Sequence, residues 1–309
     1  MKIKKSIAIL GGTSHIGKNL ILYFQKDTQF NLFLFSRDEK KMEKTILENN
    51  FDKNLNIKKY EKFNNFKFDA IINCIGISDP LKLLEMDSSL CAEFTEYDDM
   101  VLTYLKYHPL TNYIYFSSGA VYGEDFSKPT NDLTEIKIPN YDVSPYALCK
   151  MKTELKHRKL KNFKIIDVRL FSFFSRYIDI NAKFIISEIV KSIQNKKIFF
   201  TNDINIRRDY VHPEDLFKFL KICINHNSNC ALDIYSQEPI SKLNLLEYLK
   251  NKFGLKYEIN KIDLAKSPTG FKRNYYSESQ TATKLGFKPN FSSLETISKE
   301  LEYLLKTQS

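Results

Sequence analysis

The sequence predicts an α/β fold, a Rossmann-like doubly wound parallel sheet with a smaller C-terminal α/β lobe, and three observations predict it. Several short apolar runs are continuous rather than alternating, as in strands that are covered on both faces. Stretches of helical periodicity separate these runs, and strand–helix alternation is typical of a parallel sheet. The first run also leads directly into a glycine-rich turn. With 309 residues, the chain is long enough for one large domain or two ordinary ones.

The first strand is expected at Ser6–Leu10, and the run Gly11-Gly12-Thr13-Ser14-His15-Ile16-Gly17 follows it at once. A dinucleotide's pyrophosphate binds at such a junction, on backbone N–H groups and on the positive end of the next helix. Gly11 is expected to form the tight turn, and Gly17 to let the helix pack close to the sheet. Ser14 stands where glycine is usual, so the fingerprint is incomplete.

The second strand, Asn31–Phe35, ends in Ser36-Arg37, with Lys40 and Lys41 nearby. An acidic residue commonly stands at this position, where it binds the ribose 2′-OH of NAD. Here a hydroxyl and a guanidinium replace it, and the charge and planar donors of Arg37 suit a 2′-phosphate. We therefore expect a preference for NADP(H), with NAD(H) as the alternative.

Later strands are expected at Phe68–Gly76 and Phe163–Val168, with helical sequence over much of Asp87–Tyr107. The first of these strands ends in Asn73-Cys74-Ile75-Gly76, where the backbone is open to a cofactor. Ligands of such sheets bind at the carboxyl ends of the strands, so these turns are expected to share one edge.

The run Tyr113–Gly123 is a buried strand that ends in a serine- and glycine-rich turn containing Ser118. Further on, Ser144-Pro145 is typical of a helix start. On that helix Tyr146 and Lys150 share a face. An ammonium beside a phenol lowers the phenol's pKa towards the range of a general acid or base, and Ser118 is suited to bind a carbonyl oxygen. By itself, a Tyr-x-x-x-Lys pair also occurs by chance in lysine-rich chains.

The composition argues against several classes of protein. No apolar run is long enough to span a bilayer, and the N-terminus resembles a first strand rather than a signal peptide, so we expect no membrane partner. The net charge of +10 is scattered without a basic block, so we expect no nucleic-acid partner, although a basic surface suits an anionic substrate.

The five cysteines lack a C-x-x-C pair, and the odd number argues against a disulfide framework and fits a reducing cytoplasm. The histidines show no metal-ligand spacing, so no metal is expected.

The C-terminal part should form the smaller lobe. Helices are expected at Phe184–Ile193, Lys242–Phe253 and Leu294–Leu305, and a strand at Lys256–Lys261. Residues 1–170, joined by 203–225, are expected to form the cofactor domain, and 171–202 with 226–309 the substrate lobe. In that lobe Phe271–Tyr276 mixes basic and aromatic groups, which suits either a nucleotide diphosphate or an exposed loop.

Six motifs occur in order along the chain: the Gly11/Gly17 turn, Asn73–Gly76, Ser117–Gly123, Tyr146 with Lys150, Arg207–Leu216 and Thr283–Pro289. Together they resemble the extended short-chain dehydrogenases/reductases of the NAD-dependent epimerase/dehydratase family, which act on nucleotide-activated sugars. The resemblance covers nearly the whole chain.

The resemblance implies roles for individual residues. Tyr146 matches the family's catalytic tyrosine, Lys150 the lysine that binds the cofactor ribose, and Ser118 the hydroxyl that bonds the reacting oxygen. The implied cofactor site comprises Gly11, Thr13, Ser14, His15, Ile16, Gly17, Ser36, Arg37, Asn73, Cys74, Ile75, Gly76, Phe116, Tyr146, Lys150, Leu170 and Phe171. The implied substrate site comprises Ser118, Ser172, Arg208 and Arg273, with Arg208 at a position that often binds the sugar nucleotide's phosphates.

Some positions depart from the family's pattern. Ser172 replaces a usual asparagine, and Ser175-Arg176 replaces a usual Gly-Pro, both on the substrate side. The family's 4,6-dehydratases carry an Asp-Glu pair directly after the catalytic hydroxyl, because they eliminate water. Gly119 and Ala120 occupy those positions here, so a 4,6-dehydratase is not expected.

Cofactor preference decides between the remaining activities. An epimerase recycles a tightly held NAD, whereas a net reductase consumes NADPH, so Ser36-Arg37 favours a reductase. We expect NADPH-dependent reduction of a keto group, at C4, on a nucleotide-activated deoxy sugar in surface-polysaccharide precursor synthesis. The alternatives are an NAD-dependent C4 epimerase and a non-catalytic dinucleotide-binding regulator. As in many relatives, the helices around Asp98–Tyr107 and Tyr146–His157 are expected to form a homodimeric four-helix bundle.

Overall fold

The computed structural model describes residues 3–76, 88–123, 125–136, 144–260 and 272–306. Asp87, Lys261 and Phe271, which the sequence assigned to a helix, a strand and a loop, lie outside these ranges.

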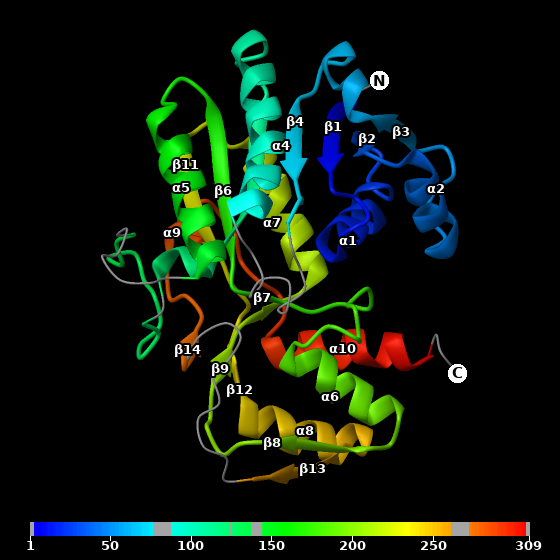
Figure 1. Ribbon diagram of the computed structural model, residues 1–309, viewed down its shortest axis with the longest axis vertical. Coiled ribbons are helices and arrows are strands. Elements are labelled where there is room, and N and C mark those ends of the chain that lie inside the picture. Colours follow the sequence, from blue (N-terminus) through cyan, green and yellow to red (C-terminus); the bar gives the residue numbers. More distant parts are fainter. Residues whose placement is uncertain (1–2, 77–87, 124, 137–143, 261–271, 307–309) are drawn as a thin grey trace.

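The main sheet has seven strands in the order β11-β6-β5-β4-β1-β2-β3 (Figure 1). Every neighbouring pair is parallel. The order reverses between β1 and β4, which makes the sheet doubly wound and confirms the predicted fold class. The strands are β1 (Lys5–Leu10), β2 (Phe30–Ser36), β3 (Asn56–Lys59), β4 (Ala70–Asn73), β5 (Asn112–Ser118), β6 (Lys164–Leu170) and β11 (Cys230–Ile234).

Helices cover both faces of this sheet, because its strands are apolar on both sides. On one face lie α1 (His15–Phe24), α2 (Glu39–Glu48) and α7 (Pro213–Asn225), packed on a core that includes Ile114 and Phe116. The opposite face carries α4 (Ser88–Tyr107) and α5 (Pro145–Lys159). Along β5 the side chains alternate, so Tyr113 and Tyr115 point to the side of α4 and α5.

A smaller lobe lies beyond the carboxyl ends of the strands (Figure 1). It has its own core, built from α6 (Ile185–Gln194), α8 (Lys242–Phe253), α10 (Ser293–Lys306) and the strand pair β8 (Ile198–Thr201) and β13 (Lys256–Ile259). Short strands connect the lobe to the main sheet. These are β7 (Ser172–Phe173) with β10 (Tyr210–Val211), and β9 (Arg207–Arg208) with β12 (Ile240–Ser241) and β14 (Asn274–Tyr275).

Short 3₁₀ turns and one short helix complete the described elements: η1 (Tyr60–Asn65), η2 (Gly119–Tyr122) and α9 (Thr281–Lys284). Helix ends follow local capping chemistry. The Ser144 hydroxyl accepts a hydrogen bond from the Ala147 N–H at the start of α5, and Ser241 does the same for Asn244 at the start of α8. The cap at Ser144 was predicted from the sequence.

One strand lies elsewhere than the sequence division suggests. Residues 226–309 were grouped with the substrate lobe, but β11 (Cys230–Ile234) pairs with β6 as the outer strand of the main sheet. The reason is that α7 packs on the sheet against α1 and returns the chain to that edge, as in any strand–helix–strand unit.

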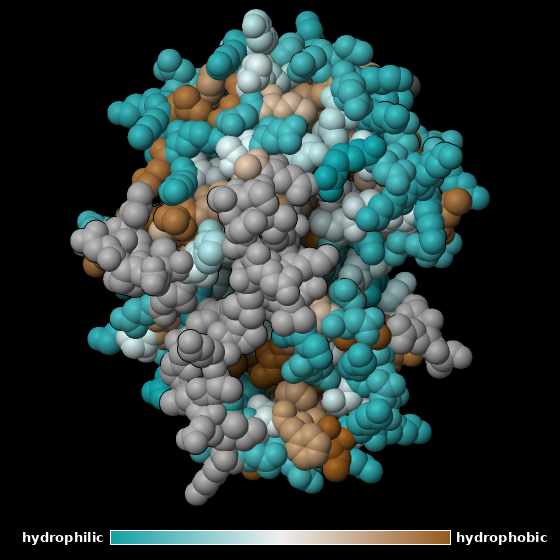
Figure 2. Space-filling view, viewed as in Figure 1, coloured by the Kyte–Doolittle hydropathy of each residue, from teal (hydrophilic) through white to brown (hydrophobic). Residues whose placement is uncertain are grey.

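The face shown in Figure 2 is largely hydrophilic, and the apolar residues on it are scattered. Within the described ranges, no helix combines the length and the apolar character that a membrane crossing requires.

Candidate active site

The glycine-rich turn lies at the point where the strand order reverses, which is where open α/β sheets bind ligands. Gly11 has φ +77°, and a Cβ atom there would lie 3.0 Å from the Cys74 backbone. A Cβ on Gly17 would lie 2.3 Å from the Gly11 carbonyl oxygen. Both glycines are therefore required by close backbone approach, as expected from the sequence.

Ser14 and His15 have structural contacts in this turn. The Ser14 hydroxyl caps α1, accepting a hydrogen bond of 3.0 Å from the Gly17 N–H, which gives a physical reason for serine in place of glycine. The His15 Nε2 atom lies 2.8 Å from the Ser175 hydroxyl, and its ring packs on Phe173. Burial, assisted by the charge of Lys18, lowers the pKa of His15 to about 3, so the imidazole is neutral. Thr13 and Ile16 are half-buried beside them.

At the end of β2, the Ser36 hydroxyl bonds the backbone of Asp38, and the Asp38 carboxylate caps α2 by accepting from the Lys41 N–H at 3.0 Å. Arg37 is exposed there. Tyr60, which sequence reasoning did not single out, hydrogen-bonds the Gly11 backbone. Burial raises the pKa of this phenol, against an opposing effect of Arg37. Tyr60 directly follows β3, and only the order of the strands brings the end of β3 to this edge of the sheet. No sequence motif therefore marks Tyr60.

Two hydrogen bonds of the Asn73 side chain fix the loop after β4. The Asn73 amide donates to the Tyr113 hydroxyl at 3.0 Å, and its oxygen accepts from the Ile75 N–H at 3.0 Å. Cys74 is buried against the turn, and burial raises the pKa of its thiol. Gly76 is exposed and has open space around its Cα.

Ser118, Tyr146 and Lys150 come together at the carboxyl end of β5. The Ser118 hydroxyl is near enough to the Tyr146 phenol to act on its pKa, and the Lys150 Nζ atom lies 5.8 Å from the centroid of the Tyr146 ring. The Lys150 ammonium donates to the Phe116 carbonyl at 2.8 Å and to the Tyr115 hydroxyl at 2.9 Å. The strand and helix predicted from the sequence thus bring the three groups into one cluster.

The electrostatics differ from the expectation for Tyr146. Burial raises the pKa of this phenol, and only the hydrogen bond from Ser118 opposes the rise. The predicted lowering by Lys150 is therefore wrong for the protein alone. Burial also lowers the pKa of Lys150 to about 8, against the charges of Asp167, Asp98 and Glu154. At neutral pH the phenol is protonated and the ammonium is charged.

Tyr275 is a further phenol in this cluster, and sequence reasoning missed it. Its hydroxyl lies 3.1 Å from the Ser118 hydroxyl, although β14 belongs to the C-terminal lobe. The Arg208 guanidinium carbon lies 5.7 Å from the Tyr275 ring centroid, and the Lys272 Nζ atom 5.0 Å from it. The basic and aromatic composition around Phe271–Tyr276 was the available signal.

The predicted substrate residues divide into two sets. Arg208 lies beside Tyr275, and its guanidinium donates to the Lys272 carbonyl at 2.6 Å. The Arg273 side chain is exposed, and its carbonyl accepts from the Arg207 N–H at 2.7 Å. Ser172 is half-buried in β7. The buried Lys272, not the exposed Arg273, therefore stands closest to the cluster among the basic residues of this segment whose contacts are described.

Phe171 fills the space beside Ser118. A Cβ on Gly119 would lie 2.4 Å from the Phe171 ring, and this ring packs against Tyr122, Phe126 and Tyr275. A carboxylate side chain at position 119 does not fit while Phe171 occupies this place. The structure gives a physical reason for the glycine where dehydratases carry an acid.

The Ser175-Arg176 departure also has a structural basis. Ser175 is fully buried and contacts His15 and the Asn19 amide, both on α1. The Arg176 guanidinium forms two hydrogen bonds to Glu300 on α10 and the Arg176 backbone N–H a third, and the guanidinium carbon lies 3.5 Å from the Tyr303 ring centroid. This segment thus ties the turn before α1 to the C-terminal lobe.

The cysteine count argued against a disulfide framework, but one pair of the described cysteines is joined. Cys91 on α4 and Cys149 on α5 are joined by a disulfide bond, and Cys74, Cys223 and Cys230 are free thiols. An odd number of cysteines excludes only complete pairing, and the packing of α4 on α5 brings two of them together. The bond lies in a small apolar cluster with Phe94, Ile75 and Tyr146.

Solved structures of similar fold support this architecture. UDP-glucose 4-epimerase from Thermotoga maritima, with UDP-glucose, aligns with a TM-score of 0.81 at 16% identity, covering 98% of this chain and 100% of that one. UDP-glucose 4-epimerase from Stenotrophomonas maltophila, with NAD and formylated UDP-arabinopyranose, aligns with a TM-score of 0.82 at 12% identity, covering 98% of both chains. dTDP-glucose 4,6-dehydratase from Bacillus anthracis, with NAD, aligns with a TM-score of 0.77 at 15% identity, covering 98% and 97%. At such identities the likeness shows the fold.

The sequence itself matches a family model. No curated protein is similar enough to match the chain. The model of the NAD dependent epimerase/dehydratase family, however, matches residues 7–235, which include the glycine-rich turn, Ser118, Tyr146 and Lys150. The chain therefore belongs to the NAD dependent epimerase/dehydratase family and is an enzyme of the short-chain dehydrogenase/reductase superfamily.

Proposed function

We propose that this protein reduces a keto group, at C4, of a nucleotide-activated deoxy sugar with NADPH, in the synthesis of surface-polysaccharide precursors. The observation that carries the proposal is the cluster of Ser118, Tyr146 and Lys150 at the carboxyl end of β5. This cluster lies at the same edge of the sheet as the glycine-rich turn, where a nicotinamide dinucleotide would lie along the switch point.

The residues at that edge fit a dinucleotide. The turn leads into the N-terminus of α1, the positive end of that helix, and the close approach of Gly11 to Cys74 and of Gly17 to Gly11 leaves no room there for side chains on the two glycines. The implied cofactor residues from Gly11 to Gly17 and from Asn73 to Gly76 lie at or next to this turn. Phe116 lies near the end of β5, and Leu170 and Phe171 lie at and just after the end of β6, on the same edge of the sheet. A bound NADPH supplies the hydride for the carbonyl carbon.

The chain's own part in the reaction is proton transfer and charge stabilisation. Tyr146 is protonated at neutral pH, because burial raises its pKa, and this is the form that a reduction needs. We assign to Tyr146 the donation of a proton to the carbonyl oxygen, and to Ser118 a hydrogen bond to the same oxygen. The Lys150 ammonium stabilises the negative charge that develops there.

The substrate lobe, assigned to residues 171–202 and 226–309 without β11, would hold the nucleotide diphosphate. Arg208 and Lys272 flank Tyr275 and bring positive charge to the cluster. We also assign further substrate contacts to Ser172 and Arg273. The exposed Arg37 after β2 supports NADPH as the cofactor, because its guanidinium suits a 2′-phosphate.

An NAD-dependent C4 epimerase is the second candidate, and one observation favours it. Asp38 directly follows Arg37 and places a carboxylate at the N-terminus of α2. This carboxylate would repel the negatively charged 2′-phosphate of NADP(H), which NAD lacks. The epimerase from Stenotrophomonas maltophila, described above, holds NAD.

Cofactor binding to the purified protein tests the proposal. NADPH and NADH are titrated by fluorescence, and the protein as isolated is analysed for retained dinucleotide. Exchangeable NADPH that binds at least ~10-fold tighter than NADH supports the reductase, since each tenfold corresponds to one charge-assisted contact. NAD retained through purification contradicts it and favours the epimerase, and binding without turnover of any nucleotide sugar favours the regulator.

A matched pair of variants sharpens this test. Arg37→Ala should remove the preference for NADPH and leave the NADH affinity unchanged. Lys40→Ala removes another exposed cation nearby and should leave both affinities unchanged. Equal losses in the two variants would show a general charge effect instead of recognition of the 2′-phosphate.

We also propose a homodimer in which α4 and α5 of each chain form a four-helix bundle. Tyr107 on α4 and Leu155 on α5 are exposed apolar side chains on these helices. Light scattering should give twice the mass of 36.3 kDa, and Leu155→Glu should return it to the mass of one chain. A single-chain mass for the unchanged protein contradicts the bundle.

A further inference from the structure

Lys150 is hydrogen-bonded to Tyr115 on β5, a residue to which none of the six sequence motifs assigns a role. The lysine is 3% exposed, and its Nζ atom donates to the Tyr115 hydroxyl at 2.9 Å. The same Nζ atom lies 4.3 Å from the centroid of the Tyr115 ring. Tyr115 therefore meets the ammonium both with its oxygen and with its π face, a contact that strengthens in a desolvated site.

The Tyr115 hydroxyl is oriented as an acceptor. The Lys150 Nζ atom donates to it, and the nearby Thr153 hydroxyl donates to the Cys149 carbonyl at 3.0 Å. Because the threonine proton is used in this way, Thr153 can act towards the Tyr115 O–H only as an acceptor. The phenol oxygen then presents its lone pair to Lys150.

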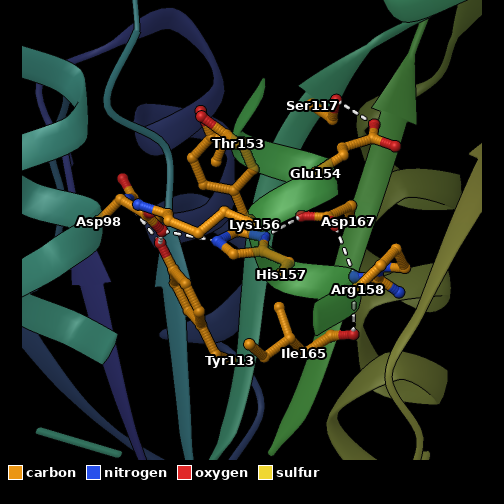
Figure 3. A network of polar contacts seen from close by, with 12 residues as sticks. Asp98, Tyr113, Ser117, Thr153, Glu154, Lys156, His157, Arg158, Ile165 and Asp167 are labelled. Atoms are coloured by element: carbon orange, nitrogen blue, oxygen red, sulfur yellow. Dashed lines mark hydrogen bonds and ion pairs between the residues drawn. The ribbon is translucent and has the colours of Figure 1, made fainter. Parts of the chain in front are cut away.

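Figure 3 shows a buried ionic network around His157, and the Tyr115 ring packs against this histidine. The ring packs edge-on against His157, with centroids 5.4 Å apart and planes at 87°. His157 lies between Asp98 on α4 and Asp167 on β6, and it is hydrogen-bonded to both carboxylates. The imidazole therefore links α4, α5 and the sheet, and its edge-on contact restricts movement of the Tyr115 ring.

The hydrogen-bond donors of Lys150 indicate what this arrangement does. An ammonium has three N–H donors. Within the described residues, two of them have acceptors, the Tyr115 hydroxyl and the Phe116 carbonyl. The third remains for the groups on the cofactor side of the cluster.

We propose that Tyr115 is a positioning residue for Lys150, which fixes the ammonium through its hydroxyl and ring and leaves one N–H directed at the reacting groups. The proposal rests on the role proposed for Lys150 in the reductase. Tyr115 itself touches neither substrate nor cofactor in this scheme. Its effect on the reaction passes through the lysine.

The protonation of Lys150 reports on this contact. Removal of the Tyr115 hydroxyl takes away an acceptor that stabilises the charged form, so the lysine should lose its proton at lower pH. We expect a shift of about one pH unit, the size of a hydrogen bond to a charged group. The titratable groups that act on Lys150 are Tyr115 on β5, Asp98 on α4, Tyr146 and Glu154 on α5, and Asp167 on β6, and the charged His157 packs on the Tyr115 ring.

The test uses the full-length protein labelled with ¹³C at lysine side chains and titrated by NMR between about pH 6 and pH 10. Burial lowers the pKa of Lys150 to about 8, which separates its signal from those of surface lysines. Lys150→Arg assigns the signal by deleting it. In Tyr115→Phe the midpoint should fall, and as the pH is raised, NADPH affinity and turnover should be lost at a correspondingly lower pH.

A matched control removes another buried phenol hydroxyl. Tyr104 on α4 is 2% exposed, and its hydroxyl donates to the Phe66 carbonyl and accepts from the Phe68 N–H, away from Lys150. Tyr104→Phe should lose thermal stability to a similar extent and leave the Lys150 midpoint in place. An equal midpoint in Tyr115→Phe and the unchanged protein, or an equal shift in Tyr104→Phe, overturns the proposal.

A second variant covers the case in which Tyr115→Phe does not fold. Thr153→Val removes the acceptor of the Tyr115 proton and keeps the side-chain shape, so the midpoint should fall by a smaller amount. An unchanged midpoint in Thr153→Val then overturns the proposal. Because the lysine is titrated without cofactor or sugar, a midpoint shift together with inactive protein refutes the reductase and leaves the positioning role intact.

Discussion

The Nδ1 atom of His157 lies 2.7 Å from a carboxylate oxygen of Asp167, and both side chains are fully buried. The opposite ring nitrogen lies 2.8 Å from Asp98, so each nitrogen faces an acceptor that has no proton to give. A ring in this position carries both protons and is an imidazolium. Burial alone would lower the pKa of His157, but the charge of Asp167 and the hydrogen bonds to both carboxylates raise it to about 9.

This raised pKa predicts a pH-dependent stability. The folded protein holds the His157 proton more tightly than the unfolded chain, whose pKa is about 6.5. The stabilisation is therefore complete below about pH 6.5 and is lost as the pH rises through about 9, with an amplitude on the order of 3 kcal/mol. Urea denaturation across this range measures it.

The comparison requires a variant, because other groups titrate in the same range. Lys150 has a lowered pKa and contributes the opposite trend between about pH 8 and pH 10.5. In His157→Gln the loss between about pH 6.5 and pH 9 should disappear, while the variant is less stable overall. A free energy of unfolding with the same pH slope in both proteins contradicts the imidazolium assignment.

Tyr146→Phe tests the proposed proton donor. The variant keeps the ring in its buried place beside Ser118 and removes only the acidic proton. Turnover of the authentic keto sugar should fall by about 10²–10⁴-fold, the usual contribution of a positioned general acid, with little change in NADPH affinity. Steady-state kinetics with parallel cofactor titration measures both, and unchanged turnover would sink the mechanism.

Gly119→Ala should be costly although it adds a single methyl group. The new Cβ would lie 2.4 Å from the Phe171 ring, which three aromatic neighbours hold in place. Overpacking of this kind costs about 1–3 kcal/mol of unfolding free energy. In the double variant Gly119→Ala/Phe171→Leu, the loss should be smaller than the sum of the two single losses. Additive losses measured by denaturation would show that the two positions do not compete for space.

The disulfide predicts a thiol count. Without reductant, the denatured protein should expose three reactive thiols, those of Cys74, Cys223 and Cys230. In Cys149→Ser all four remaining cysteines should react. Reduction should also lower the melting temperature, because cross-links of this kind stabilise proteins by about 2–4 kcal/mol. Five reactive thiols in the unchanged protein would show that Cys91 and Cys149 are not joined.

Local signals were enough for much of the fold. The helix Lys242–Phe253 was predicted with the bounds that the structure has, because Ser241 caps its start and Gly254 ends it in the left-handed conformation. Tyr146 and Lys150 share a face through helix geometry alone, and the glycine-rich turn reflects contacts within one strand–turn–helix unit.

Contacts between distant segments were not predictable in the same way. Tyr115 and Tyr275 reach the cluster only through the order of the strands and the docking of the lobe, which no short motif encodes. The direction of the Tyr146 pKa shift was wrong because spacing indicates neighbours but not the depth of burial. The capping role of Ser14, by contrast, could have been read from its position before a helix.

The hydrogen bond between Ser118 and Tyr275 spans a sequence separation of 157 residues. A ribosome delivers the glycine-rich turn, β5 and α5 long before it delivers β14, so a growing chain can assemble the turn and the proposed proton donor while Ser118 still lacks this partner. Closing so long a loop costs more entropy than any step within the sheet, and contacts of this separation slow folding. Completion of the site therefore coincides with completion of the polypeptide, and a chain interrupted before β14 is left with a sheet that has no finished pocket.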